Sequence, residues 1–181
     1  MKTLLAFTLS LIATAIAAFG TELEARLLRF SGETPPAANL VALLEANAFA
    51  YATPFSATLL ENKTFEYRAL TPVQYPTNFD DHGKADATET RDTGIAFSGD
   101  ATLLDGQYNL NLNFSLVERA NTILYPHKSG STMAQPVFRS DSMKTNIVAR
   151  PNEWVLLEFP GNRTPAPSGP DRQVLLVRVR P

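Results

Sequence analysis

Acidic side chains gather between residues 80 and 92, and closely spaced carboxylates are ligands that calcium prefers. The calcium loop of helix–loop–helix proteins places acidic residues at alternate positions, followed by a glycine and a distal glutamate. The segment does not have that spacing. We therefore interpret it as a solvated acidic loop and retain three calcium candidates, Asp80, Asp81 and Asp86.

Histidine and serine side chains are the other groups that could do chemistry. His82 lies in the acidic loop, and His127 precedes a serine-rich stretch that holds Ser129, Ser131, Ser140 and Ser142. No Gly-x-Ser-x-Gly nucleophile elbow and no His-Glu-x-x-His metal motif occurs. The chain has no cysteine, which excludes a disulfide scaffold, a zinc–thiolate site and a thiol nucleophile. We predict that the protein is not an enzyme and holds no cofactor.

The first residues have the form of an export signal. Lys2 supplies a positive start, Leu4 to Ile16 is apolar, and Ala15-Ile16-Ala17 is a small-x-small cleavage pattern. A membrane-spanning helix would need about 20 apolar residues, more than this run provides. We expect residues 1–17 to be a signal peptide and residues 18–181 to be a single exported domain without a membrane-spanning segment.

The charge of the chain is nearly balanced, with a formal net charge of −2 over 181 residues. No cluster of lysine or arginine stands out, so nothing predicts a nucleic-acid partner. Residues 18–181 are long enough to build a hydrophobic core.

Hydrophobic periodicity predicts a mainly β protein. Glu22–Phe30 alternates as a strand does, and a helix is expected over residues 35–47, with Thr34 as its N-cap and Pro35 in its first turn. Asp105-Gly106 predicts a tight hairpin turn. The further strands expected are residues 55–60, 65–69 (hairpin-linked to the preceding one), 95–103, 107–118, 137–149, 154–159 and a central strand over 173–179.

About eight strands and one helix predict a β-sandwich or a rolled antiparallel sheet, Ig-like or secretin-like. Along residues 107–116 every second residue is apolar, as in a half-buried antiparallel strand. The aromatic residues Phe97, Phe114 and Trp154 could line a ligand pocket, but their spacing favours a place in the core.

Several motifs follow one another in an order that resembles the β-domain of bacterial secretins of type II and III secretion systems and type IV pili. They are PPAANLVALLEAN, SATLLENKTFEYRAL, the Tyr-Pro-Thr-x-Phe-Asp element at residues 75–80, TRDTGIAF with LLDGQYNLNLNFSLVE, QPVFR at 135–139, and the closing RQVLLVRVRP. The match is divergent, because Glu158 and Phe159 stand where the family usually carries a Gly-Gly pair, and it is truncated, because the long N-terminal modules of the family are missing.

The resemblance implies an exported, non-catalytic accessory or structural protein of a type IV pilus or type II secretion-like envelope assembly. Its partners would be secretin or pilus components, and its location the periplasm or the outer membrane. The segment from residue 77 to 91 would be a mobile or partner-facing loop, with Phe79, Asp80, Asp81 and His82 as partner-binding candidates. The alternative is an Ig-like binding module or adhesin that recognises a glycan or peptide through its loops.

Overall fold

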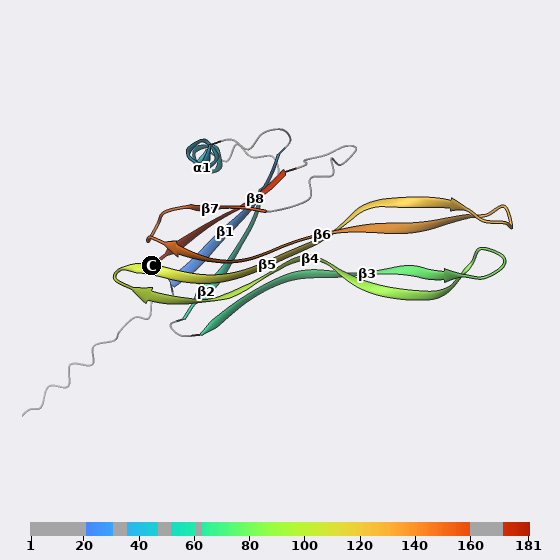
Figure 1. Cartoon of the computed structure of the whole chain (residues 1–181), viewed down its shortest axis with the longest axis horizontal. Coiled ribbons are helices and arrows are strands. Elements are labelled where there is room, and N and C mark those ends of the chain that lie inside the picture. Colours follow the sequence, from blue (N-terminus) through green and yellow to red (C-terminus); the bar gives the residue numbers. More distant parts are fainter. Residues whose placement is uncertain (1–20, 31–35, 47–51, 61–62, 160–171) are drawn as a thin grey trace, which may run out of the picture.

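The computed structural model describes residues 21–30, 36–46, 52–60, 63–159 and 172–181. It contains two antiparallel four-stranded sheets and one helix, which confirms the predicted β-sandwich (Figure 1). In chain order the elements are β1 (Thr21–Phe30), α1 (Ala37–Glu45), β2 (Ala52–Leu59), β3 (Thr64–Phe79), β4 (Ala85–Leu104), β5 (Gln107–Pro126), β6 (Thr132–Ala149), β7 (Val155–Glu158) and β8 (Arg172–Arg180).

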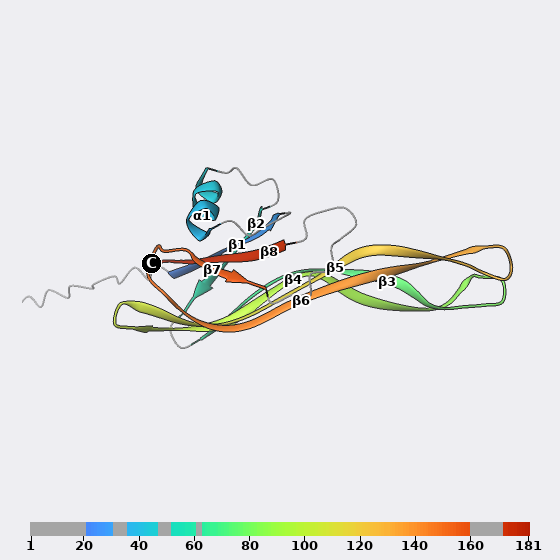
Figure 2. The ribbon, with the colours of Figure 1, turned by 45° about the horizontal axis from the view of Figure 1, so that its top comes forward.

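The first sheet has the strand order β2-β1-β8-β7, so β8 is central, as its dense apolar sequence predicted. Alternate side chains of β8 serve two different apolar clusters. Leu175 and Val177 belong to the core between the sheets, whereas Val174 and Leu176 belong to a second cluster with Leu40 of α1. The helix covers the outer face of this sheet (Figure 2). A strand covered on both faces needs apolar residues at nearly every position.

The helix is shorter than the sequence predicts. It begins at Ala37, and Pro36 occupies the N-cap without a side-chain capping bond. Proline fits this place because its missing N–H would be unpaired at a helix start anyway. Thr34 and Pro35, which were expected to start the helix, lie outside the described residues.

The second sheet has the order β3-β4-β5-β6 and contains the long strands. Along β5 the predicted alternation is confirmed, because Leu110, Leu112, Phe114 and Leu116 are buried. The turn between β4 and β5 is also confirmed: Asp105 and Gly106 have φ values of 50° and 75°, as a tight hairpin turn requires.

Aromatic rings from both sheets meet in the core. The ring of Phe97 is fully buried, and its centroid lies 5.2 Å from that of Phe55 and 5.4 Å from that of Phe65. Phe114 is buried in the same cluster. Trp154 instead packs in the helix-side cluster, where the guanidinium of Arg178 lies 4.3 Å from its ring centroid.

The expected hairpin between residues 55–60 and 65–69 is wrong. The two segments belong to β2 and β3, which lie in different sheets. Phe55 and Phe65 both point into the core from opposite layers. The connection therefore crosses from one sheet to the other, and a polar turn between two alternating segments does not distinguish these two geometries.

The expected loop over residues 77–91 is wrong as well. β3 continues to Phe79, β4 begins at Ala85, and the two strands pair from Thr64↔Asp100 to Phe79↔Ala85. The sequence of this segment predicted a loop because its apolar residues do not recur at every second position, as they do in a half-buried strand. Strands that leave a core need no such alternation, since both sides can be solvated.

Beyond the core the second sheet divides into two ribbons. The pairing of β4 with β5 ends at Gly94↔Val117, while the β3/β4 and β5/β6 pairs continue outward (Figure 1). Gly94 has a φ of 126°, and a Cβ there would lie 2.0 Å from the carbonyl oxygen of Ala69. Glycine thus permits the sharp local geometry at which the ribbons separate. We call them ribbon A (residues 71–93) and ribbon B (residues 117–140).

Candidate functional site

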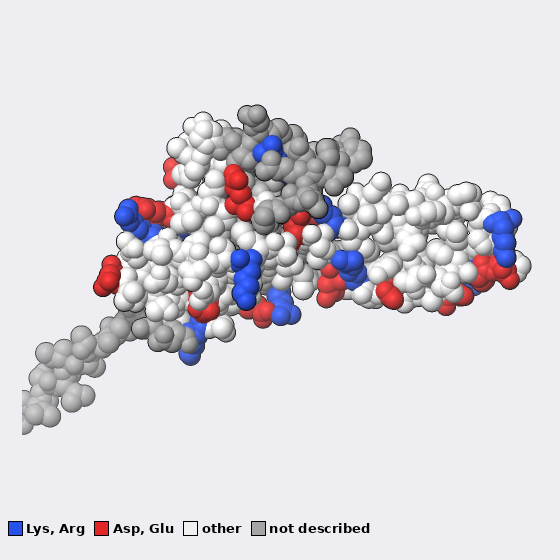
Figure 3. All heavy atoms as spheres, in the orientation of Figure 1, with Lys and Arg blue, Asp and Glu red and all other residues white. Residues whose placement is uncertain are grey.

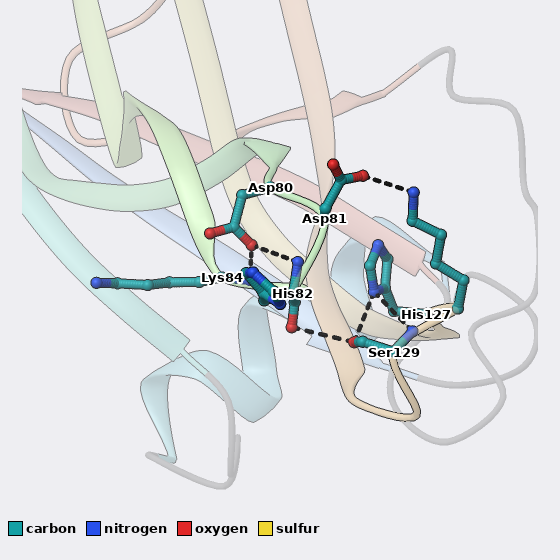
Figure 4. A network of polar contacts seen from close by, with 7 residues as sticks. Asp80, Asp81, His82, Lys84, His127 and Ser129 are labelled. Carbon is teal, nitrogen blue, oxygen red and sulfur yellow. Dashed lines mark hydrogen bonds and ion pairs between the residues drawn. The ribbon is translucent and has the colours of Figure 1, made fainter.

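The turns at the ends of the two ribbons lie against each other, far from the core (Figures 1 and 4). They comprise residues 80–84 of ribbon A and residues 127–131 of ribbon B, and together we call them the tip cluster. The cluster combines two histidines, two aspartates and two lysines with two serines at an exposed position of the molecule. Most of these residues are exposed, and the others are half-buried.

Asp80 builds the turn of ribbon A. Its Oδ1 accepts hydrogen bonds from the backbone N–H of Lys84 at 2.8 Å and of His82 at 2.9 Å. Gly83 adopts a φ of 78° and donates its N–H to the carbonyl oxygen of Asp80 at 3.0 Å. The carboxylate of Asp80 therefore shapes its own turn.

The turn of ribbon B has a similar plan. The backbone N–H of Gly130 donates to the carbonyl oxygen of His127 at 2.9 Å, and Gly130 has a φ of 83°. The Oγ of Ser129 lies 2.7 Å from Nδ1 of His127. These two residues are neighbours within one turn, so the contact is local to that turn.

Three contacts join the two turns. Lys128 Nζ lies 2.5 Å from Asp81 Oδ1, and the hydroxyl of Ser129 donates to the carbonyl oxygen of His82 at 3.0 Å (Figure 4). Ser131 donates to the same oxygen at 3.3 Å. The side chains of the ion pair are 71% and 83% exposed, so solvent screens their attraction.

The electrostatics of the tip favour an ionised Asp80. The hydrogen bond from the Lys84 backbone lowers the pKa of the Asp80 carboxyl below its usual 3.8. Desolvation opposes this shift, while the His82 backbone bond and the electrostatic effects of Lys84 and His127 add to it. A carboxylate that accepts backbone N–H groups is more stable in its charged form.

We expect the turn of ribbon A to loosen in acid. A lowered pKa in the folded state means that Asp80 contributes stability above its unfolded pKa and that this contribution is lost as pH falls through the lower folded value. NMR titration of the His82 and Lys84 amides should therefore show a transition with a midpoint below 3.8. Asp80→Asn retains an acceptor and cannot titrate, so it should lack the transition. A midpoint at or above 3.8 would contradict this account.

A second set of contacts connects the ribbons nearer the core. The rings of Tyr75 and Phe138 lie 5.2 Å apart, and the guanidinium of Arg91 lies 5.0 Å from the Phe138 ring centroid. Arg91 Nη2 also donates to Ser140 Oγ at 2.9 Å. Tyr75 donates its hydroxyl to Glu89 at 3.0 Å, and this bond raises the pKa of the tyrosine.

The structure separates the calcium candidates. Asp80 binds backbone amides of its own turn, Asp81 pairs with Lys128, and Asp86 accepts a hydrogen bond from Asn78 at 3.1 Å. Within the described part of the chain, no group of three or more histidine or acidic side chains could hold a metal ion. The calcium candidates thus do not form a common ligand set in this conformation.

The predicted partner-binding residues have different places in the structure. Asp81 and His82 belong to the joined tips, while Phe79 is half-buried at the end of β3 and Asp80 supports the turn. Sequence reasoning missed Lys128 as the partner of Asp81. The sequence feature that could have indicated the turn of ribbon B is the polar segment at residues 127–131, which follows the apolar stretch ILYP.

A polar ladder crosses the outer face of the second sheet. Asn146 of β6 donates to Asn111 of β5 at 2.7 Å, and Asn111 donates to Asp100 of β4 at 2.7 Å. A shallow hollow runs along this row, and Lys144 also lines it. Hydrogen-bonded side chains thus extend across the exposed face of this sheet from β4 to its edge strand, β6.

No known protein-family model matches the chain, and no curated protein matches its sequence. Among solved structures, the chain is similar to the InvG secretin domain β-barrel from the Salmonella SPI-1 injectisome NC-base. The identity is 14% and the TM-score 0.42, and the overlap covers 88% of this chain and 60% of that chain. Values this low do not assign the chain to the secretins. No helix in the described ranges has the length and apolar character needed to cross a membrane.

Proposed function

We propose that this protein is an exported, non-catalytic structural component of an envelope assembly of the type IV pilus or type II secretion kind. It would act by association with secretin or pilus components in the periplasm or at the outer membrane. The signal-like start and the order of the sequence motifs support the location. The long ribbons support a role in contact with other proteins, because they extend the surface of the molecule far beyond its core (Figure 3).

The observation that carries the proposal is that β6 is an edge strand, which pairs on its outer side with no other strand of the described residues. Each sheet has two edge strands: β2 and β7 in the first, β3 and β6 in the second. β7 is only 4 residues long, and β2 contains Pro54. β3 contains Pro72 and Pro76, which lack the N–H that strand pairing needs.

β6 differs from those strands. After Pro136 it runs without proline from Val137 to Ala149. An edge strand with unpaired N–H and C=O groups is a template for another strand unless proline, charge or a covering element blocks it. The β6 edge is therefore the best suited of the described edges to bind a partner strand.

The side chains of β6 offer little resistance to such pairing. Arg139 and Asp141 form an ion pair at 2.8 Å, which leaves Lys144 as the remaining charge between Val137 and Ala149. Asn146 on the same strand ends the polar ladder and can continue it with a polar side chain from a partner.

Two neighbouring proline substitutions test the edge. In an antiparallel pair the N–H groups of successive residues point alternately to the partner strand and away from it. Of Lys144→Pro and Thr145→Pro, one removes an N–H bonded to β5 and should destabilise the fold. The other removes an outward N–H, and we expect it to keep its melting temperature while its recovery of envelope components falls at least tenfold.

Gln74→Pro on β3 is the matched control. Gln74 lies two residues from both Pro72 and Pro76, so its N–H points to the same side as theirs and its loss should leave the fold and the binding unchanged. Recovery would be measured as secretin or pilus proteins identified by mass spectrometry after capture from envelope extracts. Unchanged recovery with the well-folded β6 variant would contradict the proposal. Loss only with variants of the tip would instead favour the binding-module alternative.

A further inference from the structure

The two ribbons separate at Gly94 and meet again at their tips. Between these points, in the described structure, β4 and β5 are not paired with each other. Residues 85–93 of β4 and 118–126 of β5 therefore each have a backbone edge that faces no strand partner. Beyond the paired base, the described residues join ribbon A to ribbon B through two sets of contacts that involve side chains, one at the tips and one around Phe138 nearer the core.

The contacts at the tip are of a kind that opens readily. The Asp81–Lys128 pair is largely exposed, and the bonds from Ser129 and Ser131 to His82 are also at the surface. Exposed ion pairs are weak and lose strength with salt. The energy that joins the tips is thus small in comparison with that of the strand ladders within each ribbon.

The backbone of the tip is nevertheless shaped for this contact. A Cβ added to Gly83 would lie 2.0 Å from Ser131 Oγ on the opposite ribbon. Gly130 occupies the corresponding place in the other turn and also has a positive φ, but a Cβ there would meet nothing within 4 Å. An alanine at 83 would therefore force the Ser131 hydroxyl to rotate away, and its bond to the carbonyl oxygen of His82 would be lost.

We propose that the tip cluster is a releasable clasp that holds the two ribbons in one closed arrangement. When the clasp opens, the ribbons swing apart about the region of Gly94, and the contacts of Tyr75 with Phe138 and of Arg91 with Ser140 part as well. The edges of β4 and β5 that face no strand partner are exposed in both arrangements, and opening leaves more room beside them for an extended polypeptide. Only the use of this opening during assembly rests on the proposed function. The closed and open arrangements are a property of the isolated chain.

Electron–electron distance measurements between two spin labels test the clasp directly. The chain has no cysteine, so Thr77→Cys and Thr132→Cys provide two unique labelling positions, one on each ribbon. Both positions are exposed. The otherwise unchanged protein should give one narrow distance distribution, and this distribution should broaden to longer distances in 1 M salt.

Substitutions then separate the contact from the turn. Gly83→Ala should broaden the distribution, whereas Gly130→Ala imposes the same backbone strain without the clash and should leave it narrow. Asp81→Lys should broaden it too, and the exchange Asp81→Lys with Lys128→Asp should restore it. These charge variants do not depend on Gly83 and keep the test valid if Gly83→Ala misfolds. A narrow distribution in every variant, or a broad one in the unchanged protein, would overturn the proposal.

Discussion

Replacement of Phe97 by alanine should lower the free energy of unfolding by about 3–5 kcal/mol, the largest effect we expect from a single substitution in this chain. Phe97 is fully buried, and its ring contacts Phe55 from one sheet and Phe65 and Phe114 from the other. Removing the ring loses its transfer energy and leaves a cavity that the surrounding residues close only in part.

Thermal and urea unfolding would measure the effect. For a domain of this size, roughly 2–4 °C of melting temperature correspond to each kcal/mol, so a fall of about 10 °C is expected. Tyr125→Ala is the control, because this aromatic side chain on ribbon B is 44% exposed and its loss should cost within about 0.5 kcal/mol. Equal shifts in the two variants would mean that the core is wrongly placed.

The core of this fold was predictable because its signals are local. The alternation of residues 107–116 reports directly which face of β5 is buried, and Asp105-Gly106 allows φ values that few other residue pairs adopt. The continuous apolar run of β8 likewise predicted a central strand. In each case a side-chain period or a turn preference determines the structure without reference to distant residues.

The ribbons and the tip cluster were not predictable in the same way. Ribbon A buries few residues on either face, so its sequence lacks the alternation of apolar and polar residues that predicts a strand. The strand pairing that forms it also depends on residues from both arms of the hairpin. The link between Asp81 and Lys128 joins residues 47 positions apart. The sequence shows the charges but not which turn each one meets.

Removal of the carboxylate of Glu24 should be the second strongest change, with a cost of about 3 kcal/mol for Glu24→Ala. This side chain is only 8% exposed, yet three arginines surround it. Arg26 Nη2 lies 2.6 Å, Arg178 Nη2 2.7 Å and Arg180 Nε 2.9 Å from its oxygens. Without Glu24 these positive charges would repel each other at the surface of the first sheet.

The cost should stay near the lower end of the range known for broken buried ion pairs, about 3–5 kcal/mol, because the arginines can partly return to water. Arg180 is already 50% exposed and Arg26 29%, whereas Arg178 is held at 17% exposure over the ring of Trp154. Arg178 should therefore carry most of the loss. Its stacking on Trp154 restricts the movement by which it could be solvated again.

Glu153→Ala provides the comparison, because Glu153 is 61% exposed and lies 3.8 Å from Arg150, so its loss should cost within about 1 kcal/mol. Urea unfolding at low and high salt would separate the two kinds of contact. Salt screens repulsion between like charges, so 1 M salt should recover part of the stability lost in Glu24→Ala. A Glu24→Ala variant as stable as Glu153→Ala would show that Arg26, Arg178 and Arg180 need no common counter-charge, and the ion pairs of Glu24 would then add nothing to the stability that strand pairing gives β1 and β8.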